Sequence, residues 1–341
     1  MSVSKFPSLF PQCRLRRTKE SLWCRNLIHE NILTPHDLIQ PVFVMEGISH
    51  KCTATESMPG VERMTIDALL RYIEQVIDAG IQCIALFPCV MPERVTNDCQ
   101  EAWNPDNLIC RAIREVKKHY PAIGIIADVA LDPYNAMGHD GLVIDNHVAN
   151  DETVEALIKQ SLVQAAAGAD ILGLSDMMDG RVFAIRHALE QKGFHHTMIM
   201  SYAAKYASSL YSPFRGAIGS KNMLKGDKKS YQLDPANSSE ALRKAAMDIQ
   251  EGADMIIVKP GMMYLDICRT ICDAFSIPTF AYQVSGEYAM ITAACENGWL
   301  NRNDVIIESL MAFRRSGCDG IVTYFALEAA HILHDSCWKR G

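Results

Sequence analysis

The sequence predicts a (β/α)₈ barrel, the α/β fold in which eight parallel strands alternate with helices around a closed core. Eight short apolar runs recur along the chain, and each is followed by a longer amphipathic stretch. Short, continuous apolar runs are typical of parallel strands that are buried on both faces. The eight runs cover residues 38–44, 83–88, 122–129, 171–175, 197–202, 255–260, 279–284 and 320–325.

A short local pattern recurs between the predicted helices and strands. Its copies are Gly168-Ala169-Asp170, Gly252-Ala253-Asp254 and Gly317-Cys318-Asp319, with Gly80-Ile81-Gln82 as a looser copy. In each copy we expect the glycine to end a helix, because glycine readily adopts the left-handed conformation found there. The next strand begins within three residues, so the pattern indicates repeated βα units.

The helices between the runs complete the alternation. Apolar residues at helical spacing predict a helix over 65–79, and capping residues precede predicted helices over 152–167 and 238–250. A doubly wound open sheet is the alternative arrangement of such units. It is disfavoured because no GxGxxG segment follows the first strand, and because eight strand–helix units suit a closed barrel.

The composition excludes several classes of protein. The 341 residues carry a net charge of −7, whereas a general nucleic-acid binder needs a basic face. No run of about 18 apolar residues is present to span a membrane, and the first twenty residues lack the apolar core of a secretory signal. The twelve cysteines include no Cys-x-x-Cys pair, so we expect free thiols in a reducing, cytoplasmic compartment.

Two regions fall outside the alternation. Residues 1–33 are predicted to form an N-terminal arm with one short helix, followed by a single catalytic barrel over residues 34–341. A loop over about residues 206–236 follows the fifth strand, and loops of this length are usually functional. A basic lid over the barrel mouth would suit an anionic substrate, and a solvated surface loop is the alternative. The basic residues of this loop are Arg215, Lys221, Lys225, Lys228 and Lys229.

Lysines near the ends of two adjacent strands give the clearest chemical signal, because barrel active sites lie at the carboxyl ends of the strands. Lys259 ends the apolar run MIIV, where an unpaired ammonium group would be costly unless it faced the mouth. Burial and a nearby cation lower the pKa of an amine, which can then form a Schiff base with a carbonyl. Lys205, three residues past the fifth predicted strand, could supply that cation or act as a second nucleophile. Anchoring of a phosphate or carboxylate is the alternative role.

Further polar residues follow the other predicted strands. Asp128, Asp132 and Asp140 form a carboxylate cluster after the third strand. Such a cluster could bind a cation such as Mg²⁺, exchange protons with a substrate, or only shape turns. The remaining candidates at strand ends are Ser175, Ser285 and Tyr324.

Five motifs occur together and in order along the predicted barrel: SDMMDGRV, MSYAAKYASSLYSPFR, YQLDPAN, GADMIIVKPGMMYLDI and YQVSGEYAM. In these motifs the chain resembles the porphobilinogen synthase family, also called the δ-aminolevulinic acid dehydratases. The resemblance covers essentially the whole barrel. It implies a lyase that condenses two molecules of 5-aminolevulinate into porphobilinogen with loss of two waters. That reaction is an early step of haem and other tetrapyrrole biosynthesis.

The resemblance also implies roles for individual residues. Lys259 matches the lysine that binds one substrate as a Schiff base, and Lys205 matches the second active-site lysine, which the family uses for the other substrate. Arg215 and Lys228 match cationic positions that hold one carboxylate, with Gln232 nearby. The other implied pocket residues are Ser285 and Tyr324 at the second carboxylate, together with Ser175, Tyr211 and Phe214.

The chain departs from the metal-dependent branches of this family at two places. Ala130, Asp132 and Asp140 stand where zinc-dependent members have three cysteines, so no catalytic zinc is expected without thiolate ligands. Lys244 stands where magnesium-activated members have a glutamate that anchors an allosteric ion. An ammonium group cannot ligate Mg²⁺ and repels it, so we expect no allosteric magnesium and no required cofactor. The charge of Lys244 would then replace that of the ion.

The family assembles as homo-octamers, or as hexamers in some branches, through the N-terminal arm. The resemblance therefore implies a homo-oligomer that takes 5-aminolevulinate, with neither nucleic acid nor a membrane as partner. Two other functions remain as alternatives. A class I aldolase also uses a lysine on the sixth strand, but Lys205 and the basic loop disfavour it. A catalytically silent barrel would keep the fold without reactive lysines.

Overall fold

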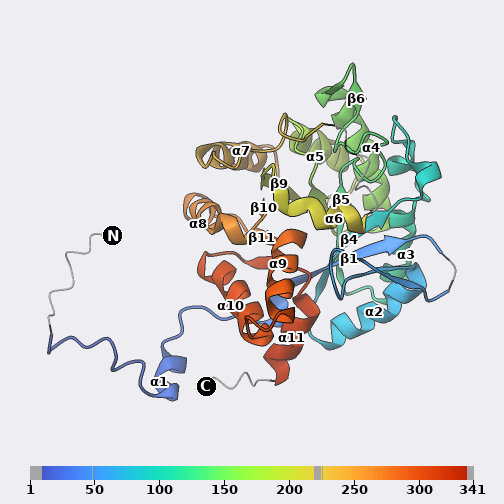
Figure 1. The fold of residues 1–341 in the computed structure, drawn as a ribbon. Coiled ribbons are helices and arrows are strands. Elements are labelled where there is room, and N and C mark those ends of the chain that lie inside the picture. Colours follow the sequence, from blue (N-terminus) through green and yellow to red (C-terminus); the bar gives the residue numbers. More distant parts are fainter. Residues whose placement is uncertain (1–9, 48, 219–223, 225, 336–341) are drawn as a thin grey trace.

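The computed structural model describes residues 10–47, 49–218, 224 and 226–335 (Figure 1). Its centre is a closed sheet of eight parallel strands in which β12 pairs with β1, so the predicted barrel is confirmed. Each strand coincides with one of the eight predicted apolar runs. The strands are β1 (Leu38–Met45), β4 (Cys83–Cys89), β5 (Gly124–Val129), β8 (Ile171–Leu174), β9 (Met198–Lys205), β10 (Met255–Lys259), β11 (Thr279–Gln283) and β12 (Gly320–Thr323).

Helices surround this sheet on its outer side (Figure 1). The three helices predicted from apolar spacing and caps correspond to α2, α4 and α7. The main helices are α2 (Ile66–Asp78), α3 (Leu108–His119), α4 (Asn150–Ala167), α5 (Arg181–Gln191), α7 (Ser239–Gln250), α8 (Leu265–Ala274), α9 (Ser285–Glu296), α10 (Arg302–Arg315) and α11 (Ala326–Asp335). Two short antiparallel ladders add to the loops: β2 (Cys52–Ala54) with β3 (Glu62–Met64), and β6 (Val143–Ile144) with β7 (His147–Val148).

The repeated Gly-x-Asp pattern fastens neighbouring strands at their amino ends. Its glycines end helices with positive φ angles, as predicted; the values are 106° at Gly168, 108° at Gly252 and 97° at Gly317. Each aspartate carboxylate also accepts a backbone N–H from the preceding strand of the sheet. These bonds run from Ile125 to Asp170 at 2.7 Å, from Ile199 to Asp254 at 2.7 Å and from Thr279 to Asp319 at 2.8 Å.

The long segment after β9, which the sequence predicts as a loop over about 206–236, contains two short helical elements in its first half. The segment forms a 3₁₀ turn, η5 (Ser209–Tyr211), and then α6 (Ser212–Ala217). The Ser208 hydroxyl caps η5 by accepting the Leu210 amide, and a proline opens α6. The segment returns to the barrel where Tyr206 forms a bridge with Leu233. Its ends are thus held together at the mouth.

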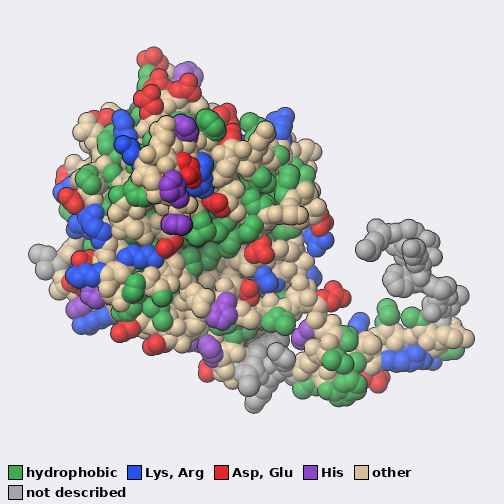
Figure 2. All heavy atoms as spheres, turned by 180° about the vertical axis from the view of Figure 1, so that it is seen from behind, with side chains coloured by type: hydrophobic (Ala, Val, Ile, Leu, Met, Phe, Trp, Pro, Cys, Tyr) green, Lys and Arg blue, Asp and Glu red, His purple; other side chains and the backbone are tan. Residues whose placement is uncertain are grey.

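In the described part of the chain before β1, α1 (Leu22–Leu27) is a short helix that buries none of its residues, and a 3₁₀ turn, η2 (Pro35–Asp37), leads into β1. Residues 10–27 stand clear of the barrel in both views of the whole molecule (Figures 1 and 2), whereas the chain reaches the barrel at Ile32 and Leu33, where Arg314 of α10 donates to the Ile32 carbonyl and Leu33 is buried. Among the described residues, none of the helices is both long and apolar enough to cross a membrane.

Candidate active site

The two lysines predicted as reactive groups lie on adjacent strands at the same level. Lys259 of β10 is aligned with Lys205 of β9, and only 7% and 5% of their surfaces are exposed. Lys205 is the last residue of β9 rather than a residue beyond it, because the strand is longer than predicted. Two like charges in one buried site favour loss of a proton from one of them. The strand ends therefore bring a pair of coupled amines to the barrel mouth.

The alignment of these strands changes by one residue along their length. Ser201 is aligned with Ile256, whereas Ala204 is aligned with Val258, so β9 carries one extra residue between these pairs. An extra residue of this kind is a β-bulge, and it reverses which side chains face inward beyond it.

The bulge turns Lys205 into the barrel. Before the bulge, the Ser201 hydroxyl points outward and donates to Asp248 on α7, while the Tyr202 ring lies inside, 5.2 Å from Lys259 Nζ. Strict alternation from Tyr202 would place Lys205 on the outer side. Because the extra residue reverses that order, Lys205 shares the inner side with Lys259.

Aromatic rings surround the Lys259 amine. Its Nζ lies between 4.7 and 5.5 Å from the centroids of four rings, which belong to Tyr202, Tyr211, Phe214 and Tyr282. Burial, followed by the positive charge of Lys205, lowers the pKa of Lys259 to about 7. A large share of this amine is therefore unprotonated near neutral pH, and the free amine is the form that attacks a carbonyl.

Carboxylates surround Lys205 and the loop residue Lys228. Lys205 Nζ donates to the Ser175 carbonyl oxygen and lies 3.4 Å from Asp140 Oδ2. Lys228 Nζ lies 2.8 Å from Asp140 Oδ1 and 3.5 Å from Asp132 Oδ2. Burial alone would raise the pKa of Asp140, but the charges of Lys205 and Lys228 together hold it well below its usual value. The ionised Asp140 is thus the counter-ion of both lysines.

Asp128, at the end of β5, supplies a carboxyl group of a different character. Burial and the negative charge of Asp132 raise its pKa to about 7, against the opposing effect of Lys259. Its Oδ1 has no hydrogen-bond partner among the described residues. A carboxyl group with this pKa is protonated for part of the time at neutral pH, which suits it to carry protons to and from a bound molecule.

The other side of the site is built at the amino end of α9. Ser285, the first residue of this helix, accepts the Phe214 amide at 3.0 Å and donates to the Leu210 carbonyl at 3.2 Å. This close approach needs Gly286, since a Cβ there would lie 2.5 Å from the Leu210 carbonyl oxygen. A hydroxyl group at the positive end of a helix suits the binding of a carboxylate.

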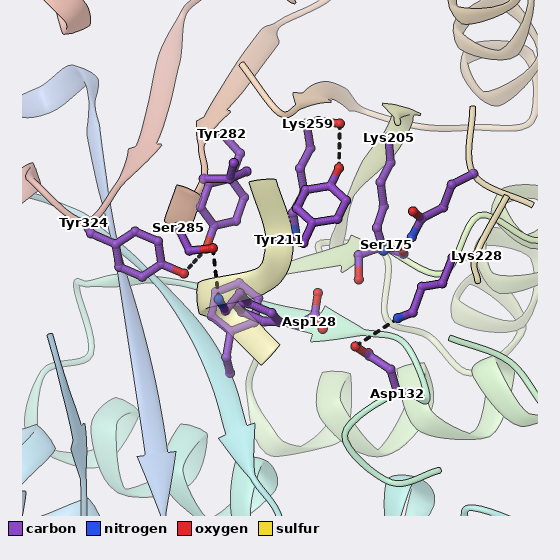
Figure 3. Close-up of a pocket in the computed structure, with 14 residues that line it drawn as sticks. Asp128, Asp132, Ser175, Lys205, Tyr211, Lys228, Lys259, Tyr282, Ser285 and Tyr324 are labelled. Carbon is purple, nitrogen blue, oxygen red and sulfur yellow. Dashed lines mark hydrogen bonds and ion pairs between the residues drawn. The ribbon is translucent and has the colours of Figure 1, made fainter. Parts of the chain in front are cut away.

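These side chains line one pocket at the carboxyl ends of the strands (Figure 3). Asp140 lies behind the lining, where it accepts the Gln232 amide at 3.1 Å. The side chain of Arg215 lies outside the described part of the chain. The predicted residues that line the pocket are Asp128, Asp132, Ser175, Lys205, Tyr211, Phe214, Lys228, Gln232, Lys259, Ser285 and Tyr324.

Three further residues line the pocket but are not predicted from the sequence: Phe87, Tyr282 and Val284. Tyr282 follows Ala281, which is aligned with Val258, so it stands level with Lys259 on the next strand. Its hydroxyl lies 3.0 Å from that of Tyr324. The register between the sixth and seventh predicted strands could have revealed Tyr282.

The acidic cluster does not fit a metal ion. The oxygens of Asp132 and Asp140 face Lys205 and Lys228, so a cation placed there would meet two ammonium groups within 3.5 Å of its ligands. Such a cation would be repelled. Within the described ranges, no group of three or more His, Cys, Asp and Glu side chains could hold a metal.

Comparison with known proteins gives a consistent picture. The family model "Delta-aminolevulinic acid dehydratase" matches residues 12–332. The delta-aminolevulinic acid dehydratase of Rhodobacter capsulatus is 56% identical over 324 residues, which cover 95% of this chain and 97% of the relative. That of Bradyrhizobium diazoefficiens is 53% identical over 327 residues, 96% of this chain and 92% of the relative.

A solved structure extends the likeness to three dimensions. It is the delta-aminolevulinic acid dehydratase (porphobilinogen synthase) of Toxoplasma gondii ME49, in complex with its reaction product porphobilinogen. Its TM-score with this chain is 0.94 at 44% sequence identity, and the match covers 98% of this chain and 95% of the other.

The lowered pKa of Lys259 predicts how its reactivity depends on pH. Trapping of a small ketone on Lys259 with borohydride should rise with pH and reach half its maximum at about pH 7, since only the free amine attacks. In Lys205→Met the half-maximum should move to higher pH, because the cation that lowers the pKa is gone. Peptide mass spectrometry across the pH series measures both values; equal midpoints in the two proteins would contradict the coupling.

Proposed function

The chain belongs to the delta-aminolevulinic acid dehydratase family, and from this premise we propose that it condenses two molecules of 5-aminolevulinate into porphobilinogen with loss of two waters. This lyase reaction is an early step in the synthesis of haem and other tetrapyrroles. The observation that carries the proposal is that Lys205 and Lys259 are aligned on adjacent strands and buried in one pocket. The same pocket is lined by Lys228 and by the hydroxyl groups of Ser285 and Tyr324, which can bind the carboxylates of two substrate molecules.

Lys259 is the proposed nucleophile. Its free amine adds to the ketone carbon of one substrate, and the resulting carbinolamine loses water to leave a protonated Schiff base. Asp128 is positioned to carry the protons of these steps, because its pKa is raised to about 7 and it faces the same pocket. The aromatic rings around Lys259 keep water away from the intermediate.

Lys205 is the proposed second active-site lysine, which serves the other substrate molecule. Its Nζ lies between the Ser175 carbonyl and Asp140, so it can approach a second ketone or stabilise negative charge that develops on it. Asp140 and Asp132 then contact the substrate amine rather than a metal. Their oxygens already accept ammonium groups from Lys205 and Lys228.

Two subsites would hold the two substrate carboxylates. Lys228 and Arg215, with Gln232 nearby, form the first, on the long segment after β9. Ser285, at the amino end of α9, and Tyr324, directly after β12, form the second. Ser175, Tyr211 and Phe214 complete the walls of the pocket.

Trapping with the natural substrate tests this function. Borohydride reduction in the presence of 5-aminolevulinate should leave a covalent adduct on Lys259, and the untrapped sample should form porphobilinogen. Lys259→Met should lose turnover by on the order of 10³-fold or more, because the covalent intermediate cannot form. The exposed Lys192→Met, outside the segment after β9, is the matched control and should keep normal turnover. A folded sample with neither adduct nor pyrrole would instead be a catalytically silent barrel.

We further propose that the enzyme belongs to the branch without a catalytic zinc and without an allosteric magnesium. Two observations support this. Lys205 and Lys228 lie against the aspartates that replace zinc-binding cysteines. Lys244 is buried against Asp179 and Asp248, at 3.1 and 3.5 Å, at the position of the magnesium-binding glutamate.

Chelation tests this assignment. Turnover should persist after exhaustive dialysis against a chelator, since no step is assigned to a metal, and added Zn²⁺ or Mg²⁺ should change it little. Steady-state rates before and after dialysis provide the measurement. Zinc-restored activity after chelation, or strong stimulation by Mg²⁺ that survives Lys244→Ala, would show that a metal acts after all.

We also propose a cytoplasmic homo-oligomer, octameric or hexameric, assembled through the N-terminal arm. Apolar side chains are exposed along the arm (Figure 2). Among them, Leu15, Trp23 and Leu27 are 75%, 69% and 76% exposed. Exposed apolar surface of this extent is typical of an interface. The cysteines in the described part of the chain are free thiols, in keeping with a reducing compartment.

Removal of the arm tests the assembly. A chain that lacks residues 1–33 should sediment at a smaller mass than the full chain, because the apolar contacts of the arm are lost. Trp23→Asp in the full chain should act in the same direction, while Arg16→Asp, a change of an exposed polar residue on the arm, should have less effect. Identical masses for all proteins in sedimentation equilibrium would rule out the arm as the main contact.

A further inference from the structure

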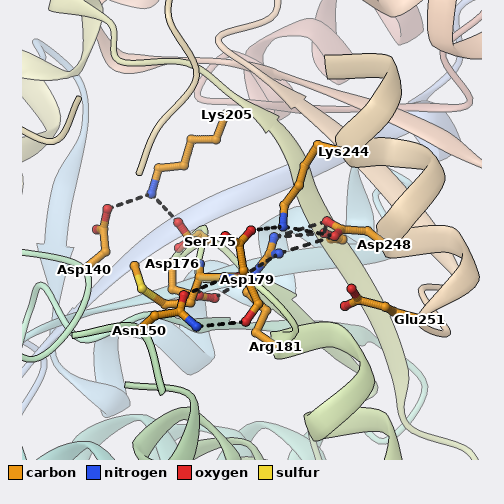
Figure 4. A network of polar contacts seen from close by, with 12 residues as sticks. Asp140, Asn150, Ser175, Asp176, Asp179, Arg181, Lys205, Lys244, Asp248 and Glu251 are labelled. Atoms are coloured by element: carbon orange, nitrogen blue, oxygen red, sulfur yellow. Dashed lines mark hydrogen bonds and ion pairs between the residues drawn. The ribbon is translucent and has the colours of Figure 1, made fainter. Parts of the chain in front are cut away.

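A row of buried charges leads from the outer surface of the barrel to Lys205 (Figure 4). At its centre is Arg181, the first residue of α5, which is fully buried together with Asp176 and Asp248. Arg181 Nε lies 3.2 Å from Asp176 Oδ2, and a terminal nitrogen of Arg181 lies 3.3 Å from Asp248 Oδ2. A buried guanidinium group is tolerated only while such partners stay in place.

The inner end of the row meets the catalytic pocket. Asp176 directly follows Ser175, and the Ser175 carbonyl oxygen accepts a hydrogen bond from Lys205 Nζ. Arg181 donates to the Met178 carbonyl at 3.1 Å, and Asp176 accepts the Met178 amide at 2.7 Å. Arg181 and Asp176 therefore fix the backbone turn that presents the Ser175 carbonyl to Lys205.

The outer end of the row is Lys244 on α7. Its Nζ lies 3.5 Å from the buried Asp248 and 3.1 Å from Asp179, whose side chain is 82% exposed. The buried cations of this group are Lys244 and Arg181, and its buried carboxylates are Asp248 and Asp176. Glu251, directly after α7, adds a further negative charge near Arg181. Without Lys244, the buried group would carry one negative charge in excess. Arg181 would then be drawn toward Asp248 and away from Asp176.

We propose that Lys244 is a positioning residue for Lys205: by neutralising Asp248, it leaves Arg181 free to hold Asp176 and the Ser175 carbonyl against the Lys205 ammonium group. Lys244 is not among the residues that line the pocket, and it acts through the side chains of Asp248, Arg181 and Asp176. The inference rests on the proposed roles of Lys205 and Lys259, because its readout is the effect of Lys205 on Lys259.

The charges that face Lys259 make that readout possible. Lys205 on β9 lowers the pKa of Lys259, whereas Asp128, Asp132 and Asp140, on and after β5, act in the opposite direction. When Lys205 moves away, the carboxylates dominate and Lys259 holds its proton to higher pH. A change confined to the stability of α7 would leave this balance unaltered.

The test compares Lys244→Met with Arg243→Met, which removes the same charge from the neighbouring exposed residue. Borohydride trapping of 5-aminolevulinate on Lys259 is measured from pH 5.5 to 9, with kcat and KM in parallel. In Lys244→Met the trapping midpoint should rise by about half a pH unit or more, and kcat should fall about tenfold with a smaller change in KM. Arg243→Met should match the unaltered protein in both respects.

Two further measurements keep the outcome decisive. Lys244→Arg retains the charge and should restore the trapping midpoint, and urea denaturation reports the stability of each variant. A lower urea midpoint in Lys244→Met with an unchanged trapping midpoint and kcat would overturn the inference and leave Lys244 a merely structural residue. Failure of the proposed function itself looks different, since the unaltered protein would then form no adduct on Lys259 at any pH.

Discussion

The burial of two lysine amines side by side is the constraint on which the rest of the structure depends. Neither could leave water alone without a large cost in free energy, and the structure accommodates each in a different way. Lys259 lies among aromatic rings with its pKa lowered to about 7, so it is ready to act as an amine. Lys205 lies against the carboxylate of Asp140. The two residues are of the same type, so it is the difference between their surroundings that gives them different roles.

The fold could be predicted almost completely, because all eight buried strands of the barrel appear as separate apolar runs. What could not be predicted depends on contacts between distant segments. The Gly-x-Asp copies predict helix ends, but the bond from the Ile125 amide to the Asp170 carboxylate depends on which strands are neighbours in the sheet. α6 has no apolar period of its own, and its Phe214 packs against Phe43 and Phe87, which precede it by more than a hundred residues.

The reactive residues could be predicted in part, because lysines and carboxylates stand out at the ends of apolar strands. Two aromatic pocket residues, Phe87 and Tyr282, do not stand out, because in the sequence they resemble core residues of apolar strands. The pairing of Lys228 with Asp140 joins positions 88 residues apart. The sequence also does not predict that the Lys205 side chain points into the barrel. That direction depends on the β-bulge in β9, and no residue type in the strand indicates a bulge.

The fastening of β9 to β10 has a consequence for the chemistry. At the amino ends of these two strands, the Asp254 carboxylate accepts a hydrogen bond from the Ile199 amide, and the Asp254 amide donates to the Ile199 carbonyl. From that anchor the alignment runs through one bulge to Lys205 and Lys259, and a slip of one residue would turn one amine outward. The distance between the two reactive nitrogens is therefore set by the strand register at the amino ends of β9 and β10. The reaction inherits its geometry from the end of the strands opposite to the pocket.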